Sequence, residues 1–334
     1  MFTGNLERAV LEALAYSDIF DYPLRLDELY RYLPLHAEIA QLPFVVESLG
    51  GQVKKRDDFY FLTGRDEIVE IRRQREARSQ ILMPHALKYG RVLGFLPFVR
   101  MVALTGSLAV MNTTRDADFD YMLIAVPGRV WTARAFALLF NRFTRLFGHT
   151  LCPNLIVSET ALAWSGHDLY YARELCQMIP ITGIDVYQKL MKANEWVSDF
   201  LPNSFLESNS LLFDNLREHT LSGTRAPALQ SFLELPLRGK LGDKFESWEM
   251  NRKIARFSKQ AGFGEETVFN AEICQGNFDH HRKWTREAYE NRMSALAAVP
   301  GGEISLTQSP GTAIGASSND SPLPLGEGLG VRVK

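Results

Sequence analysis

Two aspartates in one short segment are the residues of this sequence best suited to chemistry. Asp118 and Asp120 lead into a run of apolar and aromatic residues, 121–126. Side chains alternate between faces in a strand, so this spacing places both carboxylates on one face and Phe119 and Tyr121 on the other. Neighbouring carboxylates repel each other unless a cation lies between them, and oxygen ligands suit magnesium. The pair is therefore a candidate divalent-metal site.

A Gly-Ser pair precedes the aspartates by about ten residues. Gly106 and Ser107 follow the apolar segment 99–104, which is typical of a strand, and a short helix can come after them. Because glycine lacks a Cβ atom, backbone amides here can approach a phosphate, and the start of a helix points its positive end there. The segment predicts a phosphate-binding turn beside the metal site.

Two other interpretations of this segment stay open. Asp116 and Asp118 also form an Asp-x-Asp pair, although the apolar and aromatic residues directly after Asp120 favour the later pair and place Asp116 in the preceding turn. The aspartates could also be turn and helix-cap residues beside an ordinary strand.

Together these residues resemble the signature of the polymerase-β-like nucleotidyltransferase superfamily. That signature is Gly-Ser, a spacer of about this length and Asp-x-Asp in an apolar strand, and the likeness covers residues 101–158. The resemblance implies that Gly106 and Ser107 contact a nucleoside triphosphate and that Asp118 and Asp120 bind Mg²⁺ or Mn²⁺. The implied activity is that of a transferase, which moves a nucleoside monophosphate to a hydroxyl group of an unknown acceptor.

One position departs from the family's pattern. Active members usually carry a third carboxylate in the next strand, and here that strand, 151–157, has Asn154 at the matching position. An amide can orient a hydroxyl group but cannot accept its proton at neutral pH. Asn154 is the third catalytic candidate, and Glu159, just beyond the strand, could supply the missing acid. A catalytically inactive protein that keeps this fold to bind a nucleotide or a regulatory partner is therefore an alternative.

Residues 1–65 are expected to form a compact module. Apolar residues recur at helical spacing in three segments, and the third of these, 41–49, precedes a hairpin pattern centred on Asp57 and Asp58. Three helices followed by a hairpin resemble a winged helix. This resemblance implies a nucleic-acid-binding regulator as a further hypothesis.

The charges of this module favour another partner. Lys54, Lys55 and Arg56 on the predicted wing could contact a nucleic-acid backbone, but the segment 41–49 contains no Lys or Arg. We therefore favour a protein partner or substrate docking for the module over nucleic acid.

The remaining chain divides by composition into a basic helix, an α/β segment, a helical half and a tail. The predicted parts are a connecting helix at 66–96, a nucleotidyltransferase-like core at 97–160, a helical domain at 161–299 and a disordered tail at 300–334 rich in Gly, Ser and Pro. The expected fold class is α+β, with a small mixed sheet, an N-terminal winged helix and a mostly helical C-terminal half.

Two weaker signals lie in that helical half. His280, His281 and Arg282 could line a nucleotide or acceptor pocket, although a polar loop entering a helix is the simpler interpretation. Arg173 lies on a predicted helix that begins near Asp168, where it could reach a phosphate or form a surface salt bridge.

The composition is that of a folded protein without a strong charge bias. The chain has 334 residues, of which 46% are hydrophobic and 23% charged, and its net charge is −2. These values exclude a wholly disordered chain and give no support for nucleic-acid binding by the whole protein. Three scattered cysteines do not fit a disulfide framework or a zinc module. With no apolar span of ~20 residues and no signal-peptide pattern, we expect a cytoplasmic protein with no membrane partner.

Overall fold

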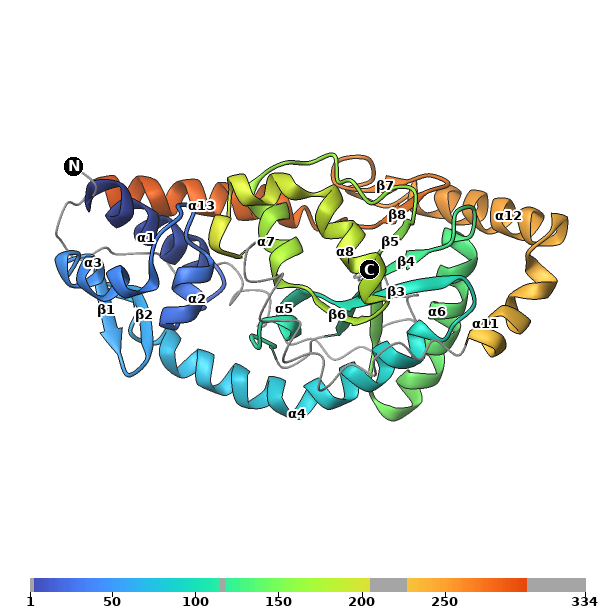
Figure 1. The fold of residues 1–334 in the computed structure, drawn as a ribbon, viewed down its shortest axis with the longest axis horizontal. Coiled ribbons are helices and arrows are strands. Elements are labelled where there is room, and N and C mark those ends of the chain that lie inside the picture. Colours follow the sequence, from blue (N-terminus) through green and yellow to red (C-terminus); the bar gives the residue numbers. More distant parts are fainter. Residues whose placement is uncertain (1–2, 115–117, 205–226, 299–334) are drawn as a thin grey trace.

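The core of the protein is a mixed sheet with helices on both faces (Figure 1). The computed structural model describes residues 3–114, 118–204 and 227–298. Its six-stranded sheet has the order β6-β3-β4-β5-β8-β7. These strands are β3 (Val99–Leu104), β4 (Phe119–Ala125), β5 (Leu151–Ser158), β6 (Ile179–Thr182), β7 (Val268–Phe269) and β8 (Ile273–Gln275). Strands β4 and β5 pair in parallel, and the other neighbours pair antiparallel. The predicted α+β class with a mixed sheet is confirmed.

The N-terminal part consists of three α-helices followed by a two-stranded hairpin. Its elements are α1 (Thr3–Asp18), α2 (Leu26–Arg31), η1 (Ile39–Gln41), α3 (Leu42–Ser48), β1 (Val53–Arg56) and β2 (Phe59–Leu62). Asp57 begins the hairpin turn with a φ of 56°, a conformation that Asp tolerates better than most residues. The helices and the hairpin therefore lie where apolar spacing and turn chemistry place them.

A single long helix links this part to the sheet. Helix α4 (Ile68–Gly94) runs from the hairpin along the lower side of the view in Figure 1. The sequence predicts a kink or a break at Pro84, and the structure shows no break, because the helix continues through this residue as one element. Ala86 and Leu93 of α4 pack against the sheet, and this burial favours continuation despite the missing backbone donor.

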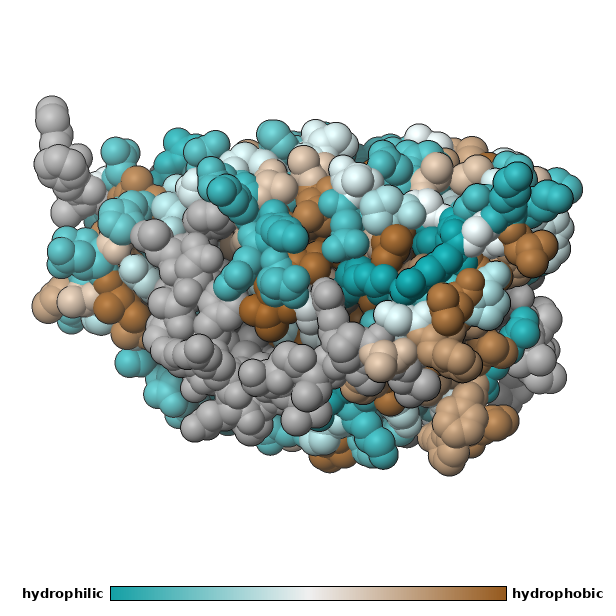
Figure 2. Space-filling view, turned by 45° about the vertical axis from the view of Figure 1, so that its right-hand side comes forward, coloured by the Kyte–Doolittle hydropathy of each residue, from teal (hydrophilic) through white to brown (hydrophobic). Residues whose placement is uncertain are grey.

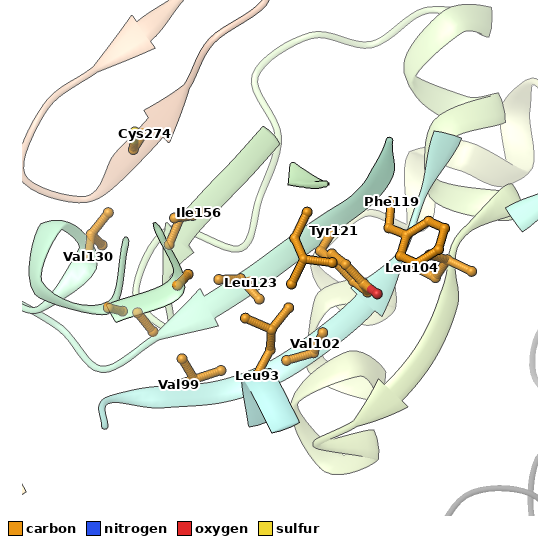
Figure 3. Packing of buried hydrophobic residues seen from close by; sticks show 14 of the residues in the cluster. Leu93, Val99, Val102, Leu104, Phe119, Tyr121, Leu123, Val130, Ile156 and Cys274 are labelled. Atoms are coloured by element: carbon orange, nitrogen blue, oxygen red, sulfur yellow. The ribbon is translucent and has the colours of Figure 1, made fainter. Parts of the chain in front are cut away.

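Strand β4 separates two hydrophobic layers. Phe119, Tyr121 and Leu123 project into the layer covered by α4 and α6 (Val130–Thr144), as Figure 3 shows. Met122 and Ile124 project into the opposite layer, which is covered by α7 (Leu169–Gln177) and α8 (Ile184–Ala193). Asp120 falls on this second side, as the period-two pattern predicts.

Strand β5 contains one extra residue. Tyr121 pairs with Pro153 and Met122 with Leu155, so Asn154 lies in a shift of the register. Leu151 and Ile156 consequently face the same hydrophobic layer although their spacing along the chain is an odd number of positions. Pro153 has no backbone donor and is tolerated at such an irregularity.

The C-terminal half is mainly helical, and it also contributes the strands β6, β7 and β8, which apolar periodicity does not predict. The remaining described elements are α5 (Gly106–Ala109), η2 (Arg145–Phe147), η3 (Glu195–Asp199), α11 (Pro227–Glu234), η4 (Leu235–Leu237), α12 (Lys240–Phe257) and α13 (His281–Ala298). Short edge strands give too few alternating residues for a clear signal. The rival position Asp116 and the predicted tail at 300–334 lie outside the described residues.

Helix α13 brings the C-terminal half back to the N-terminal module, where it lies beside α1 (Figure 1). Asp18 at the end of α1 is buried and forms ion pairs with Arg65, over 2.8 Å, and with Arg292 of α13. Arg65 also pairs with Asp21 over 2.7 Å. Removing one partner of such a buried network would leave uncompensated charge, so these ion pairs fix the module against α13.

Among the described residues, exposed apolar side chains include a group on α6 and η2. Figure 2 shows a mostly hydrophilic face on which hydrophobic residues gather toward the lower right. The exposed residues on α6 and η2 are Leu139, Phe143, Leu146 and Phe147. Among the described helices, none combines the length and the hydrophobicity needed to cross a membrane.

Candidate active site

A cavity of about 630 Å³ lies where β4 begins, and it gathers the residues predicted to do chemistry. Gly106, Ser107, Asp118, Asp120 and Asn154 all line it. They come from α5, from the residue before β4, from β4 itself and from β5. The fold therefore brings together side chains and backbone that span nearly fifty positions of the chain.

The carboxylate of Asp120 lies against the backbone of Gly106. A Cβ atom added to Gly106 would come within 2.5 Å of Asp120 Oδ2. Gly106 also has a φ of 68°, in the left-handed region that side chains other than glycine rarely adopt. Helix α5 is a single turn of four residues, so its dipole is weak and the backbone amides near Gly106 are the useful donors.

Asn154 holds the other oxygen of the same carboxylate. Its Nδ2 donates a hydrogen bond to Asp120 Oδ1 over 2.6 Å. The register shift in β5 makes this contact available, because Cys152 occupies the position directly opposite Asp120. The sequence predicted Asn154 at the site, and the structure gives it the role of orienting Asp120.

The environment of Asp120 favours its protonated form. Burial raises the pKa of Asp120 to about 7, the hydrogen bond from Asn154 opposes this shift, and the charges of Asp118 and Glu174 add to it. Carboxylates that are desolvated near one another are stabilised by a proton or by a cation. When both aspartates are ionised, the site therefore needs a cation to balance their negative charges.

Glu174 is a third acid at the cavity that the sequence did not identify. It lies on α7, lines the cavity, and burial raises its pKa to about 7. The helix begins at Asp168, whose carboxylate accepts a hydrogen bond from the Tyr171 backbone, as predicted for a capped helix. Helical spacing alone could have shown which residues lie on the same helix face as Glu174. It could not have shown that this helix, α7, covers the start of β4.

Glu159, in contrast, lies at the wrong end of the sheet. Its backbone N–H donates to the carbonyl of Ala125 at the end of β4, which is about 16 Å along the strand from Asp120. Glu159 does not line the cavity. The prediction that Glu159 could supply the missing acid is therefore wrong.

The N-terminal module forms one wall of the cavity. Tyr16, Phe20 and Tyr22 line it. The hydroxyl of Tyr22 donates to the carbonyl of Val110 over 2.9 Å, and Asn112 Nδ2 donates to the carbonyl of Phe20 over 3.0 Å. These bonds attach the module to the loop that follows Ser107.

The C-terminal half supplies another wall from the segment 275–279 and the start of α13. His281 lines the cavity. His280 instead lies 3.5 Å from Glu265, and Arg282 pairs with Asp168 over 2.5 Å. Of the three residues considered from the sequence, His281 alone is therefore placed to contact a ligand in this cavity.

The donor set of the site fits a magnesium ion that shares its coordination with a substrate. Within the described residues, no cluster of three or more His, Cys, Asp or Glu side chains is arranged to hold a metal by itself. Mg²⁺ is commonly bound by one or two carboxylates together with substrate phosphates and water. Asp118 and Asp120 supply such a pair at the cavity wall.

Comparison with known proteins adds no assignment. No family model matches this chain, and neither a curated protein nor a solved structure matches it.

The contact between Gly106 and Asp120 predicts an unusual cost for Gly106→Ala. Gly128 has nearly the same φ, 69°, but open space around it, so Gly128→Ala measures the backbone strain alone, about 1 kcal/mol. We expect Gly106→Ala to lower the free energy of unfolding by a further ~1–3 kcal/mol, because its methyl group meets the carboxylate. Urea unfolding of both variants tests this, and equal losses would contradict the close contact.

The raised pKa values predict how stability depends on pH without metal. Folded Asp120 and Glu174 keep their protons up to about pH 7, whereas unfolded carboxyl groups lose theirs near pH 4. The folded state binds more protons in between, so the free energy of unfolding should fall as pH rises from about 4 to about 7.

Urea unfolding in a chelating buffer measures this slope. The variant Asp120→Asn/Glu174→Gln should show a shallower decline than the wild type. The exposed pair Asp199→Asn/Glu195→Gln provides the control and should leave the slope unchanged. The same slope in all three proteins would refute the burial of these two charges.

Proposed function

We propose that the chain is a metal-dependent nucleotidyltransferase of the polymerase-β-like type, which transfers a nucleoside monophosphate from a nucleoside triphosphate to a hydroxyl group of a small acceptor. The observation that carries this proposal is the cavity shared by Gly106, Ser107, Asp118 and Asp120. A cavity of about 630 Å³ is within the range of volumes that small-molecule sites have.

Gly106 and Ser107 are the proposed phosphate contacts. The absence of a side chain at Gly106 leaves its backbone accessible beside Asp120, and the Ser107 hydroxyl can donate to a phosphate oxygen. Asp118 and Asp120 would hold Mg²⁺ or Mn²⁺, with Asn154 fixing the orientation of Asp120. A bound Mg²⁺ would supply positive charge that stabilises the attacking and leaving oxygens.

Glu174 is the proposed general base. As the acceptor oxygen attacks the α-phosphorus, the new O–P bond forms, the bond to pyrophosphate breaks, and the hydroxyl proton passes to the Glu174 carboxylate. A base with a pKa of about 7 is well matched to this transfer at neutral pH. An acid on α7 thus takes the role that Asn154 on β5 cannot perform.

The N-terminal module, which we propose to be winged-helix-like, closes the acceptor side of the cavity through α1. Its predicted wing is poorly placed for nucleic acid: Lys54 lies 3.2 Å from Asp66, and the ammonium group of Lys55 lies over the ring of Tyr60. Both cations thus have intramolecular contacts that a phosphate backbone would have to replace. Substrate enclosure is favoured over nucleic-acid binding.

A nucleotide-binding protein without transferase activity is the second candidate. Asn154, whose amide donates a hydrogen bond to Asp120, favours it, because an amide in place of a third carboxylate cannot accept the hydroxyl proton. The two candidates share nucleotide binding and differ in turnover.

Transfer of label from α-labelled nucleoside triphosphates tests the proposed reaction. With Mg²⁺ or Mn²⁺ and a cell extract as the source of acceptors, we expect the full chain to label a small molecule. Asp118→Asn/Asp120→Asn should reduce transfer about 1,000-fold, equivalent to ~4 kcal/mol of barrier, and the exposed Asp199→Asn should not. Binding that depends on the aspartates but is not followed by transfer would establish the second candidate. If the wild type shows neither nucleotide binding nor transfer, both candidate functions are refuted.

Glu174→Gln should lower the transfer rate about 100-fold or more at neutral pH, because the amide cannot accept the hydroxyl proton. Its affinity for the magnesium–nucleotide complex should change little. Glu159→Gln, at the far end of β4, is the matched control and should behave like the wild type. Single-turnover rates and equilibrium nucleotide binding separate these effects, and equal rates for the two variants would exclude Glu174 as the base.

A further inference from the structure

Arg173 is a buried cation at the cavity wall without a carboxylate partner. Its side chain is 2% exposed and lines the cavity. Among the described residues, no hydrogen bond or ion pair reaches its guanidinium group, and its Nε is buried without a hydrogen-bond partner. The surface salt bridge considered from the sequence is therefore excluded, and the alternative of a contact to an anion stays open.

Other buried arginines in the same region are compensated. Arg72 is 1% exposed, lies over the ring of Tyr22 and forms an ion pair with Glu28 over 2.8 Å. Arg65 pairs with Asp18 and Asp21, as described above. Arg134, which does not line the cavity, is different: its three guanidinium nitrogens are buried without a hydrogen-bond partner, and it lies over the rings of Trp131 and Phe257.

The contacts that Arg173 does make are with aromatic rings. Its guanidinium carbon lies 3.8 Å from the ring centre of Tyr32 and 4.6 Å from that of Tyr16. Cation–π contacts contribute up to about 2 kcal/mol when desolvated, whereas removing an ion from water costs several kcal/mol. Burial correspondingly lowers the pKa of Arg173. The charge therefore costs stability in the absence of a ligand.

The ring contacts of Arg173 are with the N-terminal module. The charges that act on Asp120 come from Asp118 and Glu174. Arg173 acts on the phenol groups of Tyr16 and Tyr32, which belong to the N-terminal module, and Glu174 also acts on Tyr16. Successive residues of a helix point about 100° apart, so the side chains of Arg173 and Glu174 leave α7 in different directions.

We propose, on the basis of the transferase function above, that Arg173 binds an anionic group of the acceptor, so that the acceptor carries a phosphate or a carboxylate as well as its hydroxyl group. Such an anion would supply the missing counter-charge between the rings of the N-terminal module. Glu174 would then face the hydroxyl group, and Asp118 and Asp120 would face the nucleotide. A planar guanidinium forms paired hydrogen bonds with both kinds of anion.

Arg173→Met tests the cost of the charge without any ligand. We expect its Tm to equal or exceed that of the wild type, because a buried, uncompensated ion is replaced by an apolar side chain of similar length. Arg72→Met is the matched control: it removes the ion pair with the partly buried Glu28 and should lower the Tm by several degrees. A comparable loss of Tm in Arg173→Met would mean that Arg173 is structural and would overturn the proposal.

Thermal shifts with simple anions test binding. At constant ionic strength, sodium phosphate or sodium acetate should raise the Tm of the wild type saturably relative to sodium chloride. The two probes distinguish a phosphate-bearing from a carboxylate-bearing acceptor. Arg173→Met should need at least tenfold more of the preferred anion, and Arg173→Lys, which keeps the charge, should lose less. No stabilisation of the wild type by either anion would overturn the proposal.

A last experiment tests whether Arg173 binds the acceptor or the nucleotide. With a non-transferable triphosphate analogue and Mg²⁺ already bound, the anion should still stabilise the wild type, and Arg173→Met should bind the analogue as the wild type does. Competition between anion and analogue, with weaker analogue binding by Arg173→Met, would assign Arg173 to the triphosphate and refute the acceptor site. If the wild type binds no analogue, the transferase function fails, while the anion titration still measures binding at Arg173.

Discussion

The site depends on the narrow space that one carboxylate occupies. Asp120 lies between the backbone of Gly106 and the amide of Asn154, with 2.6 Å separating its Oδ1 from the amide nitrogen. Neither neighbour is a cation, so burial is not offset by an opposite charge and the pKa of Asp120 rises. The rest of the cavity holds this unfavourable charge next to the space where a ligand can bind.

Two irregularities in the backbone of the sheet make this position of Asp120 possible. The left-handed φ of Gly106 turns the chain sharply after β3, and the extra residue in β5 redirects Asn154 toward Asp120. The same shift keeps Leu151 and Ile156 on one hydrophobic layer. The sheet thus keeps its core packing continuous while it departs from regular alternation at the position where a polar contact is needed.

Local patterns predicted the elements well, and their limits have a physical origin. The hairpin at 53–62 and the strand at 99–104 depend on alternation and turn residues within a few positions, which a sequence displays directly. The short strands β6 and β8 are defined by pairing with distant partners, and so local pattern does not reveal them. The winged-helix and nucleotidyltransferase likenesses stay predictions, because they describe families and not local chemistry.

The acids show the same limit at the level of single residues. Glu159 is near β5 in sequence, but the parallel pairing of β4 and β5 carries it to the far end of the sheet, while Glu174 enters from a helix that crosses the start of β4. Nearness to a motif is therefore a weak guide to a third acid. A stronger guide is the balance of charge within the folded cavity. Glu174 adds a third negative charge near Asp118 and Asp120, and Arg173 contributes a positive charge without a carboxylate partner. The proposed metal–nucleotide complex would bring a cation to the carboxylates, and the proposed anionic acceptor would bring an anion to Arg173.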